Sequence, residues 1–359
     1  MICLSHSVLR EILRHYAIGE LLAFERNERG FVNTGYALET RLHGEQRKYF
    51  LRRYKAGIRA EDILFEHSII NHLTAQGFSP VARVVPTKIG ATFCRRLEEG
   101  GEVFYAIFDF LTGEDKYSWV NPQCTEQEVT EAAIVLAEFH TAVSDFTPQG
   151  QRAEAKIADL LPQIARNLNQ SLKRGKNTDF DACLTENAPL ILEILTHTLA
   201  TLHEPTCRAL PQLIIHCDYH PGNLKFQNGR VVGLFDFDWA KIDYRCFDVA
   251  LAFWYFFTAW GERDGELRGE QVSRFLDAYQ QALAGKGGVG PLTPEELTYL
   301  PAMFHAANLY VLNWTISDYY QKTVNPQEYL GYLRHSVNTM RLSSEHGMEE
   351  WPGVRITNP

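Results

Sequence analysis

Three oxygen-bearing side chains lie near one another in the middle of the sequence. Asp218 follows a short apolar run, Asn223 comes five residues later, and Asp236 ends the next apolar run. Amide and carboxylate oxygens are hard ligands that suit Mg²⁺, which commonly binds through one or two protein groups together with substrate phosphates. We therefore predict that Asn223 and Asp236 hold Mg²⁺, and that Asp218 accepts the proton of an attacking hydroxyl in a phosphoryl transfer.

The local sequence indicates how these three residues are positioned. The apolar residues 213–215 predict a short buried strand, and Pro221 with Gly222 predicts a turn, so Asp218 is expected on a loop. The dipeptide Asn228-Gly229 is typical of a tight hairpin turn, because both of its residues adopt positive φ readily. Such a hairpin brings Asn223 and Asp236 close together although 13 positions separate them.

A zinc site is the alternative reading of this segment. His216, Cys217 and His220 are zinc-ligating types. Adjacent residues point in different directions on an irregular loop, however, and no distant C-x-x-C or H-E-x-x-H pattern completes a ligand set. We expect these three side chains to support the loop, with His216 as a buried histidine that holds it by hydrogen bonds.

Composition sets the class of protein. A chain of 359 residues with 45% hydrophobic and 22% charged residues is expected to fold as two lobes. The apolar run 249–260 is too short to span a bilayer. Seven scattered cysteines and the lack of a signal-like N-terminus favour the cytoplasm. A net charge of −9 argues against a nucleic-acid surface, so we expect neither nucleic-acid nor membrane partners.

Hydrophobic periodicity divides the chain into two kinds of structure. Up to residue 112 the pattern favours antiparallel strands with one long helix; we predict strands at 21–25, 35–42, 48–54, 81–86 and 103–108, and helices at 7–17 and 59–76. From residue 113 to 345 it is mainly helical; we predict helices at 125–143, 153–173, 186–203, 248–260, 266–284, 294–321 and 326–342. Residues 174–181 are expected to form a surface loop and residues 346–359 a tail.

The full set of motifs is specific enough to indicate a family. The order H-x-D-x-x-x-x-N in residues 216–223, followed by a hairpin and D-x-D in residues 234–238, resembles the phosphotransferase family of aminoglycoside phosphotransferases, choline kinases and type II homoserine kinases. This resemblance implies a protein-kinase-like α+β fold, with a small antiparallel-sheet lobe and a larger helical lobe. It also implies ATP and Mg²⁺ as cofactors, Asp218 as the catalytic base or positioner, and Asn223 and Asp236 as metal ligands.

The same resemblance assigns residues of the first lobe to the nucleotide. Arg52 is placed where the family carries the cation that binds nucleotide phosphates, and Glu66 where its ion-pair partner lies. The backbone of Asp109 and Leu111 corresponds to the segment that binds adenine. Asn33 belongs to a glycine-containing turn, residues 26–34, which we predict to lie over a phosphate. Many kinases of this fold have lysine in place of Arg52, so Arg53 and Lys55 remain alternatives for that role.

The segment after the metal-binding turn bears on the acceptor. Only 12 positions separate Asp236 from Asp248, and no A-P-E signature follows, so a bound polypeptide lacks its usual platform. We therefore expect a small-molecule hydroxyl acceptor. Asp248 is expected to cap the apolar helix, and the resemblance suggests that it is a brace as well. Asp238 is expected near the metal without binding it.

The C-terminal helices, which include the aromatic-rich segment 308–319, are loosely similar to those of homoserine kinase-like members. A homoserine-like amino alcohol is therefore the favoured acceptor. Aminoglycosides, choline or ethanolamine, and sugars remain alternatives within the same fold. A nucleotide-binding pseudokinase with a regulatory role is the alternative outside catalysis, although a scaffold would need none of Asp218, Asn223 and Asp236.

Overall fold

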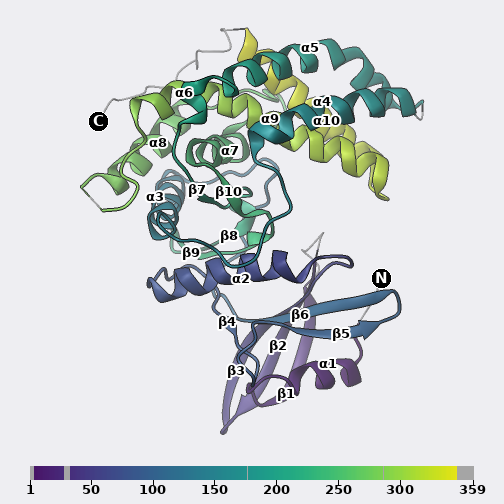
Figure 1. Cartoon of the computed structure of the whole chain (residues 1–359), viewed down its shortest axis with the longest axis vertical. Coiled ribbons are helices and arrows are strands. Elements are labelled where there is room, and N and C mark those ends of the chain that lie inside the picture. The colour runs from purple at the N-terminus through teal and green to yellow at the C-terminus, as the bar shows by residue number, and fades with distance from the viewer. Residues whose placement is uncertain (1–3, 28–32, 176, 286, 346–359) are drawn as a thin grey trace. The chain divides into compact units, whose positions relative to one another are not determined.

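The computed structural model describes residues 4–27, 33–175, 177–285 and 287–345. These residues form two compact units, each described here by itself (Figure 1). The first unit contains residues 1–114, 146–153 and 232–235, and the second contains the remainder of the chain. Among the described residues, no helix combines the length and the apolar character needed to cross a bilayer.

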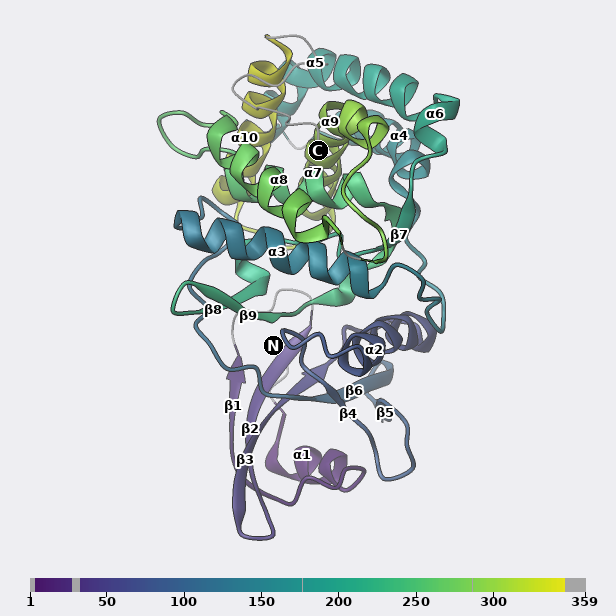
Figure 2. The same cartoon turned by 90° about the vertical axis from the view of Figure 1, so that its left-hand side faces the viewer.

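The first unit is built on a six-stranded antiparallel sheet. The strands are hydrogen-bonded in the order β1-β2-β3-β6-β4, with β5 paired to β6. Their bounds are β1 (Glu20–Asn27), β2 (Thr34–Leu42), β3 (Glu45–Arg53), β4 (Val84–Val85), β5 (Cys94–Glu98) and β6 (Gly101–Asp109). Two helices accompany the sheet, α1 (His6–Leu13) and α2 (Ala60–Ala75). Figure 2 shows α1 beside the strands β1–β3.

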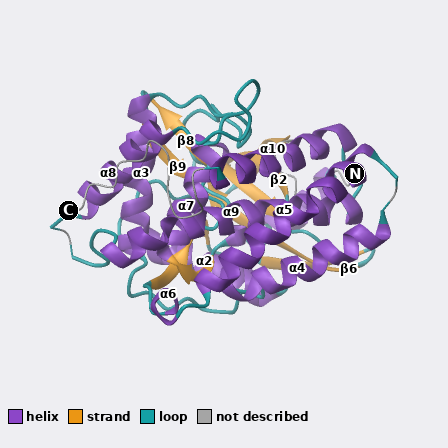
Figure 3. Cartoon of the chain, turned by 90° about the horizontal axis from the view of Figure 1, so that it is seen from above, coloured by secondary structure: helices purple, strands orange, loops and turns teal. Residues whose placement is uncertain are grey.

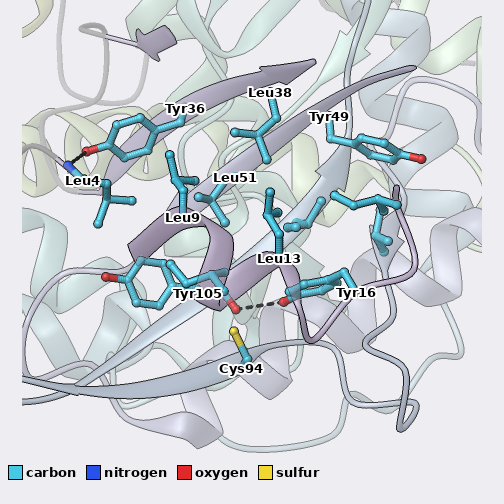
Figure 4. Close-up of a cluster of buried hydrophobic side chains, with 14 of the residues drawn as sticks. Leu4, Leu9, Leu13, Tyr16, Tyr36, Leu38, Tyr49, Leu51, Cys94 and Tyr105 are labelled. Atoms are coloured by element: carbon cyan, nitrogen blue, oxygen red, sulfur yellow. Dashed lines mark hydrogen bonds between the residues drawn. The ribbon is translucent and has the colours of Figure 1, made fainter. Parts of the chain in front are cut away.

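Helix α1 covers one face of this sheet. Its buried side chain Leu9 belongs to a core cluster with Leu38 of β2 and Leu51 of β3, and Tyr16 donates a 3.2 Å hydrogen bond to the carbonyl oxygen of Tyr105 (Figure 4). Side chains alternate between the two faces of a strand. The residue that follows Leu51 therefore points to the opposite face of the sheet, and that residue is Arg52.

The second unit is mainly helical (Figure 3). Its helices are α3 (Glu126–Ala142), α4 (Ile157–Arg174), α5 (Asp179–Leu202), α6 (Pro205–Arg208), α7 (Arg245–Phe257), α8 (Gly269–Leu283), α9 (Pro294–Gln321) and α10 (Pro326–Ser344). Every residue of α7 is buried, which explains why its sequence is apolar on all sides. A helix is thus present where one was predicted, but it begins and ends three residues earlier than the predicted bounds 248–260.

Two pairs of short strands lie between these helices in the sequence. Strand β7 (Gln212–Ile215) pairs antiparallel with β10 (Lys241–Tyr244), and β8 (Leu224–Gln227) pairs with β9 (Arg230–Leu234). Asn228 and Gly229 both have positive φ, 52° and 75°, so the predicted tight turn is confirmed. The loop between β7 and β8 carries Asp218.

Several predicted boundaries are wrong for local reasons. Helix α5 begins at Asp179, inside the predicted loop 174–181, because Thr178 and Asp181 form a capping box. The predicted strand 81–86 is reduced to β4, which ends before Pro86 because proline has no N–H to continue the ladder. Strands β5 and β10 and helix α6 were not predicted. The predicted tail 346–359 lies outside the described residues.

Candidate active site

Asp248 fixes the backbone of the loop that carries Asp218. Its side chain is fully buried, and its oxygens accept hydrogen bonds from the backbone N–H groups of His216 (2.9 Å) and Cys217 (2.8 Å). Cys217 has φ 60°, a left-handed conformation that is uncommon for residues other than glycine. The two hydrogen bonds hold this turn, and the next residue along the chain is Asp218.

The prediction that Asp248 caps α7 is therefore wrong. The helix begins at Arg245, its N-cap is Tyr244, and no side chain caps it. Asp248 lies one turn into the helix, where its carboxylate is used for the loop. The geometry supports the other role that the resemblance suggested, in which Asp248 braces the loop that carries Asp218.

A second pair of buried side chains holds Asp248 in turn. Nε2 of His140, on α3, lies 3.1 Å from Asp248 Oδ2, and Nδ1 of His140 lies 2.8 Å from the hydroxyl of Tyr279 on α8. Burial lowers the pKa of His140, although Asp248 partly opposes this, and burial raises the pKa of Tyr279. A neutral His140 then donates from Nε2–H to the carboxylate and accepts the Tyr279 hydroxyl at Nδ1.

Asp218 itself is oriented through both of its oxygens. Asn223 Nδ2 donates to Asp218 Oδ2 and to the Asp218 carbonyl, both at 2.9 Å, and the Tyr255 hydroxyl donates to Oδ1 at 3.2 Å. Nε2 of His220 lies 3.6 Å from Oδ2. The Asp218 side chain remains 18% exposed, so a ligand hydroxyl can reach a carboxylate that is already aimed.

The charge of Asp218 follows from these neighbours. Burial alone raises the pKa of its carboxyl, but the nearby His220, with smaller contributions from His216 and Asn223, outweighs burial, and the net pKa is lower than the ordinary value. Asp218 is therefore a carboxylate at neutral pH. In this form it accepts a hydrogen bond from an alcohol and orients its oxygen.

Asn223 and Asp236 fit the predicted metal role in chemistry and in placement. The amide nitrogen of Asn223 is taken by Asp218, so its oxygen is the end that is presented to a cation. Asp236 follows β9 and has φ 66°, so the chain turns sharply there. Because β8 and β9 pair, Asn223 and Asp236 lie at the same end of that hairpin.

The zinc alternative does not gain a ligand set. Among the described residues, no group of three or more His, Cys, Asp or Glu side chains is arranged to hold a metal ion. Nδ1 of His220 accepts a hydrogen bond from the backbone N–H of Gly222 (3.0 Å), and Cys217 is fully buried. A magnesium ion needs fewer protein ligands than this, because phosphates and water complete its shell.

In the first unit, the structure brings Arg52 and Glu66 together. Arg52 Nη1 lies 2.8 Å from Glu66 Oε1, with the two side chains only 11% and 3% exposed. The hydroxyl of Tyr54 donates to the other oxygen of Glu66 at 3.1 Å. Arg53 points to the opposite face of β3, where it pairs with Glu98 at 2.7 Å. This separation favours Arg52 over Arg53 for the phosphate role, which stays a prediction.

The remaining nucleotide residues are placed as follows. Asp109 ends β6, and its backbone N–H donates to the Arg83 carbonyl at 2.9 Å, so a bond to adenine at this residue would use its carbonyl. Leu111 follows the strand in an irregular segment. Asn33 Oδ1 accepts from the backbone N–H of Lys55 at 3.0 Å, which ties the turn to the end of β3. Residues 28–32 of that turn lie outside the described residues.

Sequence reasoning missed three contributors to the site. Tyr255 lies in the predicted apolar helix 248–260, and nothing in the local sequence shows that its hydroxyl reaches Asp218. His140 and Tyr279 were not assigned to the site either. Their positions 108 and 31 residues from Asp248 leave no spacing signal that could have linked them.

Solved structures confirm the predicted fold class. The microcompartment-associated aminopropanol kinase superposes with a TM-score of 0.68 at 17% identity, over 98% of this chain and 100% of that chain. An amicoumacin kinase, solved in complex with AMP-PNP and Ca²⁺, gives a TM-score of 0.65 at 17% identity, over 94% of both chains. At these identities the likeness concerns the fold.

Sequence comparisons address the family. The homoserine kinase of Chelativorans sp. (strain BNC1) is 28% identical over 357 residues, which cover 96% of this chain and 98% of that protein. The profile of the phosphotransferase enzyme family matches residues 24–292, a span that includes Arg52 and the whole segment from Asp218 to Asp248. The predicted family and the predicted class of enzyme, a kinase, are thereby confirmed: the chain belongs to the phosphotransferase enzyme family.

Proposed function

We propose that the protein transfers the terminal phosphoryl group of ATP to the hydroxyl of a small amino alcohol, with a homoserine-like acceptor favoured. The observation that carries this proposal is the state of Asp218. Its carboxylate is ionised, held by Asn223 and Tyr255, and still partly exposed. A scaffold protein has no use for a carboxylate prepared in this way.

In the proposed reaction Asp218 binds the acceptor hydroxyl and aims its oxygen at the phosphorus. The lowered pKa makes Asp218 a weak base, so its main contribution is orientation, and it takes the proton as the new O–P bond forms. This division suits phosphoryl transfer, where positioning and electrostatic stabilisation supply most of the catalysis. Tyr255 keeps the carboxylate from rotating away from the acceptor.

Asn223 and Asp236 would hold Mg²⁺, which when bound neutralises the charge of the ATP phosphates. Arg52 would contact the phosphates as well, since its planar guanidinium carries several N–H donors and can bind two phosphate oxygens at once. Glu66 and Tyr54 restrict the side chain of Arg52 to one position. These assignments rest on the fit of donor types, and each can be tested by substitution.

The acceptor class is supported by relatives of similar length. Homoserine kinases are 27–28% identical over nearly the whole chain, and the aminopropanol kinase shares the fold. Both names describe acceptors that carry a hydroxyl and an amine on a short carbon chain. Choline, ethanolamine, aminoglycosides and sugars are the alternatives that a screen must include.

The direct test is a coupled assay of ADP release with Mg-ATP and each candidate acceptor, run beside Asp218→Asn as the inactive control. We expect phosphorylation of at least one amino alcohol by the wild-type protein and a loss of about 10²-fold or more in the variant. ATP binding without turnover of any acceptor would contradict the proposal and favour a pseudokinase.

A further inference from the structure

The second unit contains a cluster of large aromatic rings, of which only Tyr255 has a role in the reaction described above. We call it the aromatic wall; it consists of Trp119, Trp254, Tyr255, Trp260, Trp314 and Tyr332. Trp119 lies at its centre. The centroid of its ring lies 4.6 Å from that of Tyr332, 5.9 Å from Trp260, 6.1 Å from Tyr255, and 6.3 Å from both Trp254 and Trp314.

The wall is assembled from distant parts of the chain. Trp119 precedes α3, Trp254 and Tyr255 belong to α7, Trp260 follows α7, and Trp314 and Tyr332 belong to α9 and α10. Trp119, Trp260, Trp314 and Tyr332 remain partly exposed. Rings that only filled a core would be closed off on all sides, and a group of partly exposed aromatic side chains is typical of a binding surface.

Tyr255 connects the aromatic wall to the candidate active site. Its ring packs edge to face with Trp119, and its hydroxyl donates to Asp218 Oδ1 at 3.2 Å. His220, which approaches the other oxygen of Asp218, also lies 5.0 Å from the Tyr255 ring. An acceptor whose hydroxyl is bound by Asp218 therefore has the wall within reach of its other end.

Two carboxylates lie beside the wall. The Tyr332 hydroxyl donates to Glu328. Trp260 stacks at 3.6 Å on His335, whose Nδ1 lies 2.6 Å from Asp264. Burial lowers the pKa of His335, although Asp264 partly opposes this, so the ring stays neutral and does not cancel the charge of Asp264.

One further carboxylate lies behind Trp314. This ring stacks at 5.8 Å on Tyr329, whose hydroxyl donates to Asp318 at 3.4 Å, and Lys322 pairs with Asp318 at 2.8 Å. Asp318 is thus neutralised by Lys322, whereas Glu328 is bonded to the Tyr332 hydroxyl and Asp264 to the neutral His335, so both keep their charge beside the wall. Aromatic faces combined with unneutralised carboxylates favour a cation.

Resting on the proposed function, we infer that the aromatic wall binds the ammonium group of the acceptor while Asp218 binds its hydroxyl. A protonated or alkylated nitrogen over tryptophan and tyrosine faces is attracted by the ring quadrupoles, and it gives up little hydration when it is alkylated. The wall thereby selects acceptors that carry a cation a short chain away from the hydroxyl. Neutral alcohols and sugars of the same size lack this interaction.

The first test measures kcat/KM for pairs of acceptors that differ at the nitrogen: homoserine against 4-hydroxybutanoate, ethanolamine against 1-propanol, and choline against 3,3-dimethyl-1-butanol. We expect the amine of the preferred pair to be used at least about tenfold better than its neutral counterpart, the size of a desolvated cation–π interaction. Equal use of both members of every pair would overturn the inference and leave the proposed function intact.

The second test needs no turnover. Quenching of tryptophan fluorescence by choline is compared in the wild type, Trp119→Leu, Trp119→Phe and Tyr320→Leu; Tyr320 is an equally half-buried ring on α9 that instead contacts Phe180. We expect Trp119→Leu to weaken choline binding about tenfold, with Trp119→Phe close to the wild type and Tyr320→Leu unchanged.

The outcomes separate the two claims. Choline binding that depends on Trp119, without phosphorylation of any acceptor, would refute the proposed kinase activity and retain the ammonium site. Phosphorylation of acceptors with choline binding that is the same in Trp119→Leu and in the wild type would refute the ammonium site. Unchanged thermal unfolding of each variant confirms that the fold is intact in these comparisons.

Discussion

The backbone N–H of Cys217 donates a 2.8 Å hydrogen bond to Asp248 Oδ1 across 31 residues of sequence. Cys217 has φ 60°, so the loop passes through a conformation that a non-glycine residue does not favour by itself. The carboxylate of Asp248 compensates for this cost by accepting from two successive N–H groups. The direction of Asp218, the next residue, depends on that interaction.

Asp248→Asn is expected to disturb the loop and the fold together. In the wild type, each of the two carboxylate oxygens accepts one backbone N–H, from His216 and from Cys217. The amide of the variant has only one oxygen, so one buried N–H loses its partner. We expect a loss of about 1–3 kcal/mol in the free energy of unfolding, measured by urea denaturation, and a fall in kcat of about 10²-fold from the misplaced Asp218. Wild-type stability and turnover in this variant would show that Asp248 does not hold the loop.

Asp218→Ala tests the catalytic residue separately from its support. Asp218 is partly exposed, and its removal leaves the hydrogen bonds of Asp248 in place. We therefore expect kcat to fall by about 10²-fold or more while the affinity for ATP, measured by calorimetry, and the unfolding midpoint stay close to the wild type. Turnover at the wild-type rate would remove Asp218 from the mechanism.

Arg52→Ala tests the cation of the first unit. A charge-assisted hydrogen bond is worth about 1.5–3 kcal/mol, so its loss should raise the apparent KM for ATP by about 10- to 100-fold. Arg53→Ala is the matched control, because Arg53 points to the other face of β3 and pairs with Glu98. If Arg53→Ala raises the KM for ATP and Arg52→Ala does not, the two roles must be exchanged.

The parts that could be predicted from sequence are those encoded locally. The apolar run, the turn at Pro221 and the Asn228-Gly229 hairpin are neighbours in sequence, so the loop position of Asp218 and the turn were predictable. Asp248 was misassigned as a cap because a carboxylate before an apolar run usually is one. Its true partners lie far away in sequence, and only the packed fold brings them to it.

The aromatic wall illustrates the same limit. Five of its rings lie in predicted helices, whereas Trp119 lies between predicted elements. Assignment of a ring to the core is correct for Trp254, which is 1% exposed. The partial exposure of Trp119 and Tyr332 depends on how a loop and α10 meet. Periodicity predicts which face of a helix is apolar, but it does not predict whether that face is completely covered.

Asp236→Asn tests the metal site. The substitution keeps the size of the side chain and removes the charge that attracts Mg²⁺. We expect the Mg²⁺ concentration for half-maximal activity to rise by about tenfold or more at saturating ATP, since one charge-assisted contact is worth at least about 1.4 kcal/mol. Asp238→Asn is the control from the same turn and should change this requirement less. An equal effect of both variants would assign the metal to the turn as a whole.

His220→Gln is expected to change the pH dependence of turnover. In the wild type, burial raises the pKa of Asp218, while His220 is the largest of the influences that bring it below the ordinary value of 3.8. The active form is the carboxylate, so turnover attributable to Asp218 falls only when the pH drops through this lowered pKa. Without His220 the effect of burial remains, the pKa rises, and the fall in kcat moves to higher pH.

The lowered pKa of Asp218 should also make the free energy of unfolding depend on pH. A carboxyl whose pKa is lower in the folded state stabilises the fold above its unfolded pKa of about 3.9, and this contribution is lost as the pH falls. His220→Gln should therefore lose less stability than the wild type between about pH 5 and 3. The measurements are kcat and urea unfolding from pH 3 to 8, with the exposed His203→Gln as the control. A kcat profile that does not move in His220→Gln would mean that His220 does not set the charge of Asp218.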